Sequence, residues 1–347
     1  MIGDRTQGRD NHFNLIRILA ATGVVVAHAF PLSRGSSEPL LLESVFGVNL
    51  GHISVLVFFA ISGFFIAKSF DQGGSLYRFT LARVLRIFPG LFVMLLLTVL
   101  IAGVFLTTAP PREYWPSAVE YVMRNMTLGW LRPYLPGVFE TNPGGATVND
   151  PLWTLFHEVV CYFGLAAAGL LGLLRRGVVA AAAFALALAL LLAAPYLALP
   201  VRIQAQADLS ITFLLGAAAY VWRDRIPLTF WIPAVACGVA LLANGTEMFK
   251  PPLYLAVASV SLWLGFARAP LLLNYNRLGD YSYGVYIYAY PIQQIIASSG
   301  VDSPLLNISM ALPLALFCSV LSWRFVERPA LKFKPASQRF ALARPAA

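Results

Sequence analysis

The chain has 347 residues, of which 59% are hydrophobic and 12% are charged, and its mean hydropathy is +0.71. Soluble domains carry about a quarter of charged residues, so this composition excludes an ordinary water-soluble enzyme. The net charge of +9 does not indicate nucleic-acid binding, because the basic residues lie in short segments between apolar runs and form no patch. We expect contact with membrane lipid and none with nucleic acid.

Apolar runs recur from one end of the chain to the other, and most have the length of about 20 residues that a helix needs to cross a bilayer. No segment alternates apolar and polar residues as the strands of a membrane barrel do. We therefore predict an all-α, polytopic integral membrane protein with about ten transmembrane helices. The predicted spans are 13–31, 48–68, 87–108, 152–173, 178–198, 207–222, 228–244, 252–267, 281–300 and 305–325.

The distribution of basic residues predicts the orientation of these spans. Most of the 25 Lys and Arg residues fall in segments on the side of the N-terminus. The other side holds Arg34, Arg112, Arg124, Arg132, Arg202 and Lys250. By the positive-inside rule both termini are then cytoplasmic. We expect residues 1–335 to form one membrane domain and residues 336–347 a short cytoplasmic tail. A cleaved signal peptide is disfavoured because Arg17 interrupts the first apolar stretch.

The first span carries two ionisable residues, Arg17 and His28, where apolar residues are the rule. Residues eleven apart share nearly the same helical face and lie roughly 16 Å apart along the axis. Arg17 could simply reach the cytoplasmic headgroups while His28 forms a structural hydrogen bond at the outer end. Alternatively, His28 transfers protons, for which the ordinary pKa of a histidine side chain is suited, and Arg17 anchors a phosphate or carboxylate.

The third span is preceded by Arg83 and Arg86, which are three residues apart and face the same side of a helix. Guanidinium groups bind phosphates through paired hydrogen bonds, so the pair could hold an anionic cytoplasmic cofactor. The other interpretation is topological, since basic residues commonly flank a span on the cytoplasmic side.

The long external connection, residues 109–151, contains Trp115 and Trp130. Its middle, Val119 to Trp130, could form a short helix at the membrane interface. The two indole rings could stack on sugar faces or anchor the loop at the interface.

The fourth span contains Glu158, which we place about 10 Å below the external surface from the rise of 1.5 Å per residue. His28 is expected at the same depth, so a carboxylate–imidazole dyad could form. Glu158 could instead pair with Arg202 or Arg132, and the neighbouring His157 could be its true partner.

The ninth span carries a helical stripe of tyrosines that includes Tyr286, a pattern more often found in packing than in ligand binding. Cys161, Cys237 and Cys318 all lie within apolar spans. They therefore indicate small packed side chains, with neither a disulfide framework nor a metal site.

Six short motifs, taken together and in order, resemble those of the membrane acyltransferase-3 family. They are Asn14-Leu15-Ile16-Arg17 with His28; Phe58-Phe59-Ala60-Ile61-Ser62-Gly63-Phe64; Arg83-Val84-Leu85-Arg86-Ile87-Phe88-Pro89; Leu152-Trp153-Thr154-Leu155 with Glu158; Gly279-Asp280-Tyr281-Ser282-Tyr283 with Tyr286 and Pro291; and Glu327-Arg328-Pro329. One departure is Ala289, since family members often carry a histidine at that position.

The resemblance implies a bacterial inner-membrane O-acyltransferase that moves an acyl group, with acetyl expected, from cytoplasmic acyl-CoA to a hydroxyl of a cell-surface or exported glycan or glycolipid. Acetyl-CoA or another acyl-CoA is then the donor, and no metal is needed. We expect His28, Glu158 and Arg17 to be catalytic, and Arg83, Arg86 and Arg17 to bind the donor. We expect the acceptor to contact Trp153, Trp115, Trp130 and Tyr286.

The alternative is a transporter or flippase of a lipid-linked glycan, which would also use intramembrane charges and many helices. Transporters often show inverted repeats and broken helices, and neither is evident here. The sequence specifies neither the acceptor nor an oligomeric state.

Overall fold

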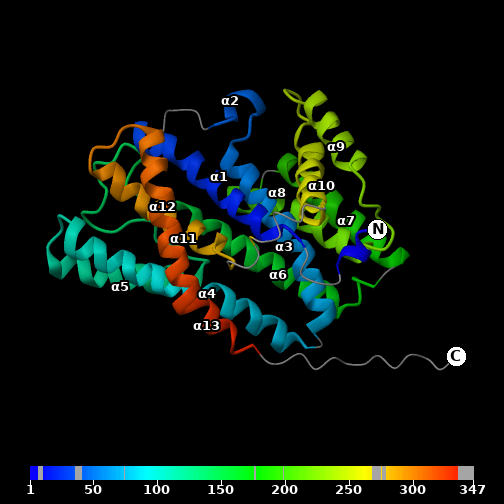
Figure 1. Cartoon of the computed structure of the whole chain (residues 1–347), viewed down its shortest axis with the longest axis horizontal. Helices are drawn as coiled ribbons and strands as arrows, with labels where there is room; N and C mark the ends of the chain where they lie inside the picture. The colour runs from blue at the N-terminus through cyan, green and yellow to red at the C-terminus, as the bar shows by residue number, and fades with distance from the viewer. Residues whose placement is uncertain are drawn as a thin grey trace.

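The computed structural model describes residues 1–6, 11–35, 41–73, 75–175, 177–197, 199–267, 275 and 279–334. The described part is built of helices, which we number along the chain (Figure 1). The α-helices are α1 (Phe13–Arg34), α2 (Glu43–Phe46), α3 (Leu50–Gly73), α4 (Leu76–Ile101), α5 (Pro111–Thr127), α6 (Trp153–Leu170), α7 (Val178–Ala193), α8 (Val201–Val221), α9 (Trp231–Leu242), α10 (Lys250–Phe266), α11 (Ser282–Ser298), α12 (Pro304–Ser322) and α13 (Arg328–Leu331). The short 3-10 and π elements include η2 (Ala102–Leu106), η3 (Asp150–Leu152) and η6 (Trp323–Glu327).

Every predicted span coincides with a helix, so the all-α prediction is confirmed for the described residues. Five of the described helical segments are long and apolar enough to cross a membrane. They are Phe13–Arg34, Leu50–Gln72, Leu76–Leu106, Asp150–Leu170 and Pro304–Leu331. Ten membrane crossings and the cytoplasmic location of both termini stay predictions, and the expected tail at 336–347 lies outside the described residues.

The first helix occupies the middle of the molecule. It packs against α3, α10, α11 and α12, while α6 packs against α3 and α8. The amino-terminal half of α4 approaches α11 and the η6 end of α12. In Figure 1 α5 lies at one end of the molecule and α9 at the other. One cavity therefore lies between helices α1, α3, α4, α6 and α11.

The closest helix pair, α3 with α8, is held together at two glycines. A Cβ atom on Gly63 would collide with the carbonyl oxygen of Phe213, and one on Gly216 would collide with that of Ala60. Small residues allow helix backbones to approach closely in a membrane, where packing replaces the hydrophobic effect as the main attraction. This contact fixes α3 at Gly63, the residue that follows Ser62, and Ser62 lines the cavity described below.

The expected interfacial helix has different bounds from those predicted. It is α5, which starts at Pro111 and ends at Thr127. A proline suits the first turn of a helix, where its missing N–H leaves no hydrogen bond unmade. The helix stops before Trp130 because Leu128 adopts the left-handed conformation, with φ 61°.

The segment after α5 is anchored to α11 by amide side chains. Asn142 donates to the side-chain oxygen of Gln294 at 2.7 Å, and Gln294 in turn donates to the carbonyl oxygen of Gly145 at 2.9 Å. Asn149 donates to the carbonyl oxygen of Ile287 at 2.9 Å. Because buried amides need partners, these bonds fix the start of α6 relative to α11.

Candidate active site

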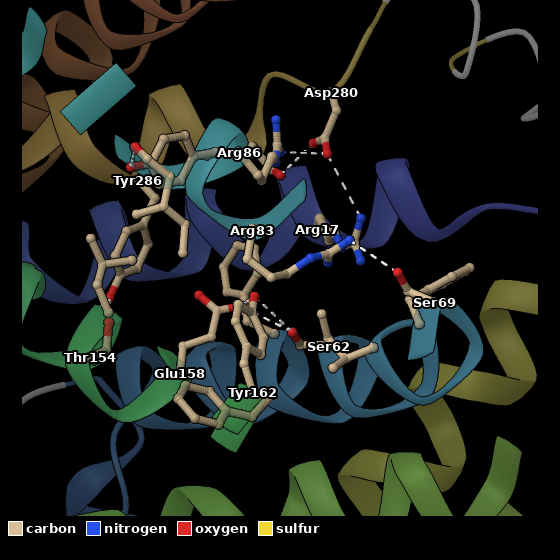
Figure 2. A pocket seen from close by; sticks show the side chains of 18 of the residues that line it. Arg17, Ser62, Ser69, Arg83, Arg86, Thr154, Glu158, Tyr162, Asp280 and Tyr286 are labelled. Carbon is tan, nitrogen blue, oxygen red and sulfur yellow. Dashed lines mark hydrogen bonds and ion pairs between the residues drawn. The ribbon is translucent and has the colours of Figure 1, made fainter. Parts of the chain in front are cut away.

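A cavity of about 640 Å³ lies between α1, α3, α4, α6 and α11. Along α3 its wall follows a single helical face from Val55 to Gln72, over roughly 25 Å. The residues of this face are Val55, Phe58, Ser62, Phe65, Ser69 and Gln72. Figure 2 shows Arg17 and Ser69 on one side of the cavity, Thr154 and Tyr286 on the other, and Glu158 between them. The cavity is long and narrow, with chemically different ends.

Arg83 lies at the basic end without a carboxylate partner among the described residues. Its Nη2 donates weakly to the hydroxyl of Ser69, at 3.4 Å. Its Nε is buried and has no hydrogen-bond partner. The guanidinium is flanked by the rings of Phe79 and Tyr162, at 5.9 and 5.8 Å from their centroids. A buried donor without a partner is unfavourable, so Arg83 is suited to bind an anion that enters the cavity.

Arg86 also lines the cavity, but its guanidinium is already paired. It donates to Asp280 at 2.6 Å and to Glu327 at 3.0 Å. Glu327 is only 1% exposed and accepts a further hydrogen bond from Ser322 at 2.9 Å. Burial favours protonation of Asp280, but Arg86 and Arg17 outweigh it and hold the pKa of this carboxyl below its ordinary value. Arg86 thus joins α4 to α11 and to the end of α12.

Other cations complete the basic end of the cavity. Arg17 lies 3.7 Å from Asp280, and its guanidinium stands over the ring of Phe65, 5.4 Å from the centroid. Lys68 and Lys334 line the cavity as well. Partial desolvation of the ammonium group and the charges of the nearby arginines lower the pKa of Lys334 to about 8. The concentration of positive charge favours a ligand with several negative charges.

Glu158 occupies the middle of the cavity, held by two hydroxyl groups. One of its oxygens, Oε1, accepts hydrogen bonds from Ser62 at 3.0 Å and from Tyr162. The other oxygen accepts none from any residue that the structure describes. Since Tyr162 follows Glu158 by one helical turn on α6, and Ser62 faces both from α3, the carboxylate is fixed in orientation. An oriented carboxylate with one oxygen free can accept a proton.

The expected pairing of His28 with Glu158 is not found. The ring of His28 packs edge-on against Tyr290 at 5.1 Å and does not line the cavity. Ala27 contacts α3 at Gly51, whereas Glu158 contacts α3 at Ser62, which is roughly 16 Å further along the axis. His28 and Glu158 therefore lie at different levels along α3.

The alternative partners of Glu158 are engaged elsewhere. His157 is hydrogen-bonded through Nδ1 to Gln206 at 2.7 Å. Arg132 pairs with Glu120 on α5. Arg202 donates to the carbonyl oxygen of Gly129 at 3.5 Å. None of the three lines the cavity.

Of the aromatic residues expected to bind the acceptor, only Tyr286 lines the cavity. Trp115 and Trp130 are 40% and 75% exposed, on and just after α5. Trp153 is 36% exposed and packs edge-on against His157 at 5.3 Å. The indoles therefore lie outside the cavity, and their role toward an acceptor stays a prediction.

Several residues of the site could not be assigned from the sequence. Ser62 belongs to an apolar motif, but nothing there predicted its bond to Glu158. Tyr162 could have been found, because a residue four positions after Glu158 shares its helical face. The charge pairs of Arg86 depend on Asp280 and Glu327, which are distant in the chain and meet only in the fold.

The comparison with known proteins agrees with this picture. The profile of the acyltransferase domain of the acyltransferase-3 family matches residues 10–324. An O-acetyl transferase of Shigella phage Sf6 is 28% identical over 330 residues, which cover 92% of this chain and 96% of that protein. Nodulation protein 10 of Rhizobium leguminosarum bv. viciae is 24% identical over 366 residues, which cover 95% of this chain and 96% of that protein. No solved structure matches.

The matched region runs from before α1 to the end of α12 and includes α1, α3, α4, α6 and α11, between which the cavity lies. The chain belongs to the acyltransferase-3 family of membrane acyltransferases.

Proposed function

We propose that this protein is an inner-membrane O-acyltransferase that moves an acetyl group from cytoplasmic acetyl-CoA to a hydroxyl of a cell-surface or exported glycan or glycolipid. The observation that carries the proposal is that one cavity joins a cluster of cations to an oriented carboxylate. The name of the Shigella phage relative, an O-acetyl transferase, supports acetyl as the acyl group and a hydroxyl as the acceptor.

The basic end suits the phosphates of coenzyme A. Arg83 supplies donors that lack a partner, and Arg17 and Lys334 add positive charge nearby. Arginine binds phosphate through paired hydrogen bonds that are stronger than neutral ones. With its phosphates there, the donor can extend along α3 so that the thioester lies beside Glu158.

The reaction breaks the C–S bond of the thioester and forms an O–C bond to the acceptor. The proton of the acceptor hydroxyl must leave, and the departing sulfur ends as the thiol of coenzyme A. Glu158, oriented by Ser62 and Tyr162, is proposed to accept the proton of the acceptor hydroxyl and to pass it to the departing sulfur. Direct transfer and a covalent acyl-enzyme both satisfy this balance.

His28 is proposed to promote transfer from the acceptor side. It lies on α1 beyond the Val55 end of the cavity, beside Tyr290. Arg17 lines the cavity, whereas His28 lies outside it, on the side from which we propose that the acceptor approaches. The indoles of Trp115, Trp130 and Trp153 are exposed, and we propose that they contact the glycan.

The test is transfer by the purified protein in proteoliposomes. Radiolabelled acetyl-CoA is supplied with an extract of cell-surface polysaccharide, and label in the polysaccharide is measured. We expect transfer by the wild type and its loss, by at least a hundredfold, in His28→Ala and Arg17→Ala. Wild-type rates in both variants would contradict the roles proposed for α1.

A further inference from the structure

The end of the cavity farthest from the cations is mostly apolar, with Thr154 as its polar member. Val55, Phe58, Leu155 and Tyr286 line it, and three of them are nearly buried, with exposed fractions of 8%, 4% and 7% for Val55, Leu155 and Tyr286. Phe58 is the partly exposed member, and it lines the cavity. An apolar compartment next to a carboxylate suits the alkyl part of an acyl group better than it suits a sugar.

Phe58 and Tyr286 pack against each other in the wall of this end. Their rings meet edge to face, with centroids 5.7 Å apart. The hydroxyl of Tyr286 donates to the carbonyl oxygen of Pro151 at 3.0 Å and contacts the hydroxyl of Thr154, so the ring cannot swing aside without losing these bonds. Phe58 and Tyr286 therefore form a fixed pair of rings in the wall of the cavity.

Phe58 is also supported from behind. It packs against a cluster of small buried side chains at the contact of α1, α11 and α12. Ala21 and Val285 of this cluster are 0% exposed, and Val25 is 1% exposed. Close-packed interiors yield little to an inserted group. The ring of Phe58 therefore cannot yield toward this cluster when an acyl chain reaches it.

The distance from the carboxylate to this wall is short. Phe58 precedes Ser62, the partner of Glu158, by one helical turn, or roughly 6 Å along α3. We propose that Phe58, backed by Tyr286, sets the length of the acyl group and restricts the enzyme to short chains of the acetyl class. The inference rests on the proposed function, because it requires a thioester beside Glu158.

Chain-length selectivity is the direct test. Transfer to cell-surface polysaccharide is measured with acetyl-CoA, butyryl-CoA and hexanoyl-CoA, and the ratios of kcat/KM are compared. One methylene in an apolar pocket changes discrimination by about tenfold to two-hundredfold. We expect the wild type to prefer acetyl over hexanoyl by at least tenfold, and Phe58→Ala to reduce this preference by at least tenfold.

Phe65→Ala is the matched control, since it makes the same change on the same face of α3 but next to Arg17. It should change the KM of every donor alike and leave the chain-length ratio within about twofold. Phe58→Leu provides a milder variant should Phe58→Ala fail to fold, and it should shift the ratio in the same direction.

Two results would overturn the inference while leaving the proposed function intact. One is a wild type that transfers hexanoyl as well as acetyl. The other is a ratio that stays unchanged in Phe58→Ala and Phe58→Leu while acetyl transfer persists. Absence of transfer from every donor by the wild type would overturn the proposed function itself, so the two failures are distinguishable.

Discussion

Arg83 and Arg86 lie one turn apart on α4, but among the described residues only Arg86 is paired with carboxylates. Its guanidinium is 2.6 Å from Asp280 and 3.0 Å from Glu327, whereas the buried Nε of Arg83 has no partner in the described part of the chain. Two arginines of one short motif therefore have different tasks. Arg86 holds helices together, and Arg83 is available to a bound anion.

Arg83→Ala should weaken donor binding without unfolding the protein. A hydrogen bond to a charged group contributes about 1.5–3 kcal/mol, so the dissociation constant of acetyl-CoA should rise by roughly tenfold to a hundredfold. Calorimetric titration of the detergent-purified protein measures it, and the thermal unfolding midpoint should stay near that of the wild type. Unchanged affinity in this variant would remove Arg83 from the donor site.

Arg86→Ala should instead destabilise the fold. The substitution removes the guanidinium that pairs with Asp280 and Glu327. Removing one partner of a buried ion pair costs about 3–5 kcal/mol of folding stability. A lower thermal unfolding midpoint in detergent is the expected result. Because Glu327→Gln removes the charge of one partner but keeps its shape, it should lower the midpoint less than Arg86→Ala does. Equal stability of Arg86→Ala and the wild type would contradict the bridging role.

Donor binding should depend on pH through Lys334. Its pKa is lowered to about 8, so the ammonium is charged below that pH and loses its charge above it. The KM for acetyl-CoA should therefore rise as the pH increases through about 8. Lys334→Arg keeps the charge at all these pH values and should give a flat profile. A rise of the same size in both proteins would assign the pH dependence to another group.

The contact of α3 with α8 should tolerate no side chain at its glycines. Gly63→Val would force the backbones apart at Phe213, and overpacking of this kind costs about 1–3 kcal/mol or more. A lower thermal unfolding midpoint and a lower yield of folded protein should result. Gly164→Ala on α6 is the control, because nothing lies within 4 Å of the added methyl group. Similar midpoints for the two variants would show that the contact is not tight.

The helices could be predicted from the sequence because each apolar run carries its own signal. Length and hydropathy alone located helices at all the predicted spans. Bounds were less reliable where local backbone conformation decided them, as at Leu128, whose positive φ ends α5 before the predicted end at Trp130.

The site was harder to predict, since it depends on the depth and rotation of helices relative to one another. Spacing along the chain placed Arg17, Arg83 and Glu158 in the site, and all three line the cavity. It could not show that Asp280 pairs with Arg86, or that Glu158 and His28 lie at levels of α3 roughly 16 Å apart. Ala289, where family members often carry histidine, packs among the small side chains between α1 and α11.

The central claim, that Glu158 is the proton-transfer group of an acyltransferase cavity, is tested most directly by the turnover of Glu158→Gln at saturating acetyl-CoA. We predict that kcat falls at least a hundredfold while acetyl-CoA still binds, since acid–base groups contribute about 10²–10⁴-fold. His157→Gln, the adjacent residue bonded to Gln206, should keep kcat within a few-fold. A Glu158→Gln protein that transfers acetyl at the wild-type rate would contradict the account.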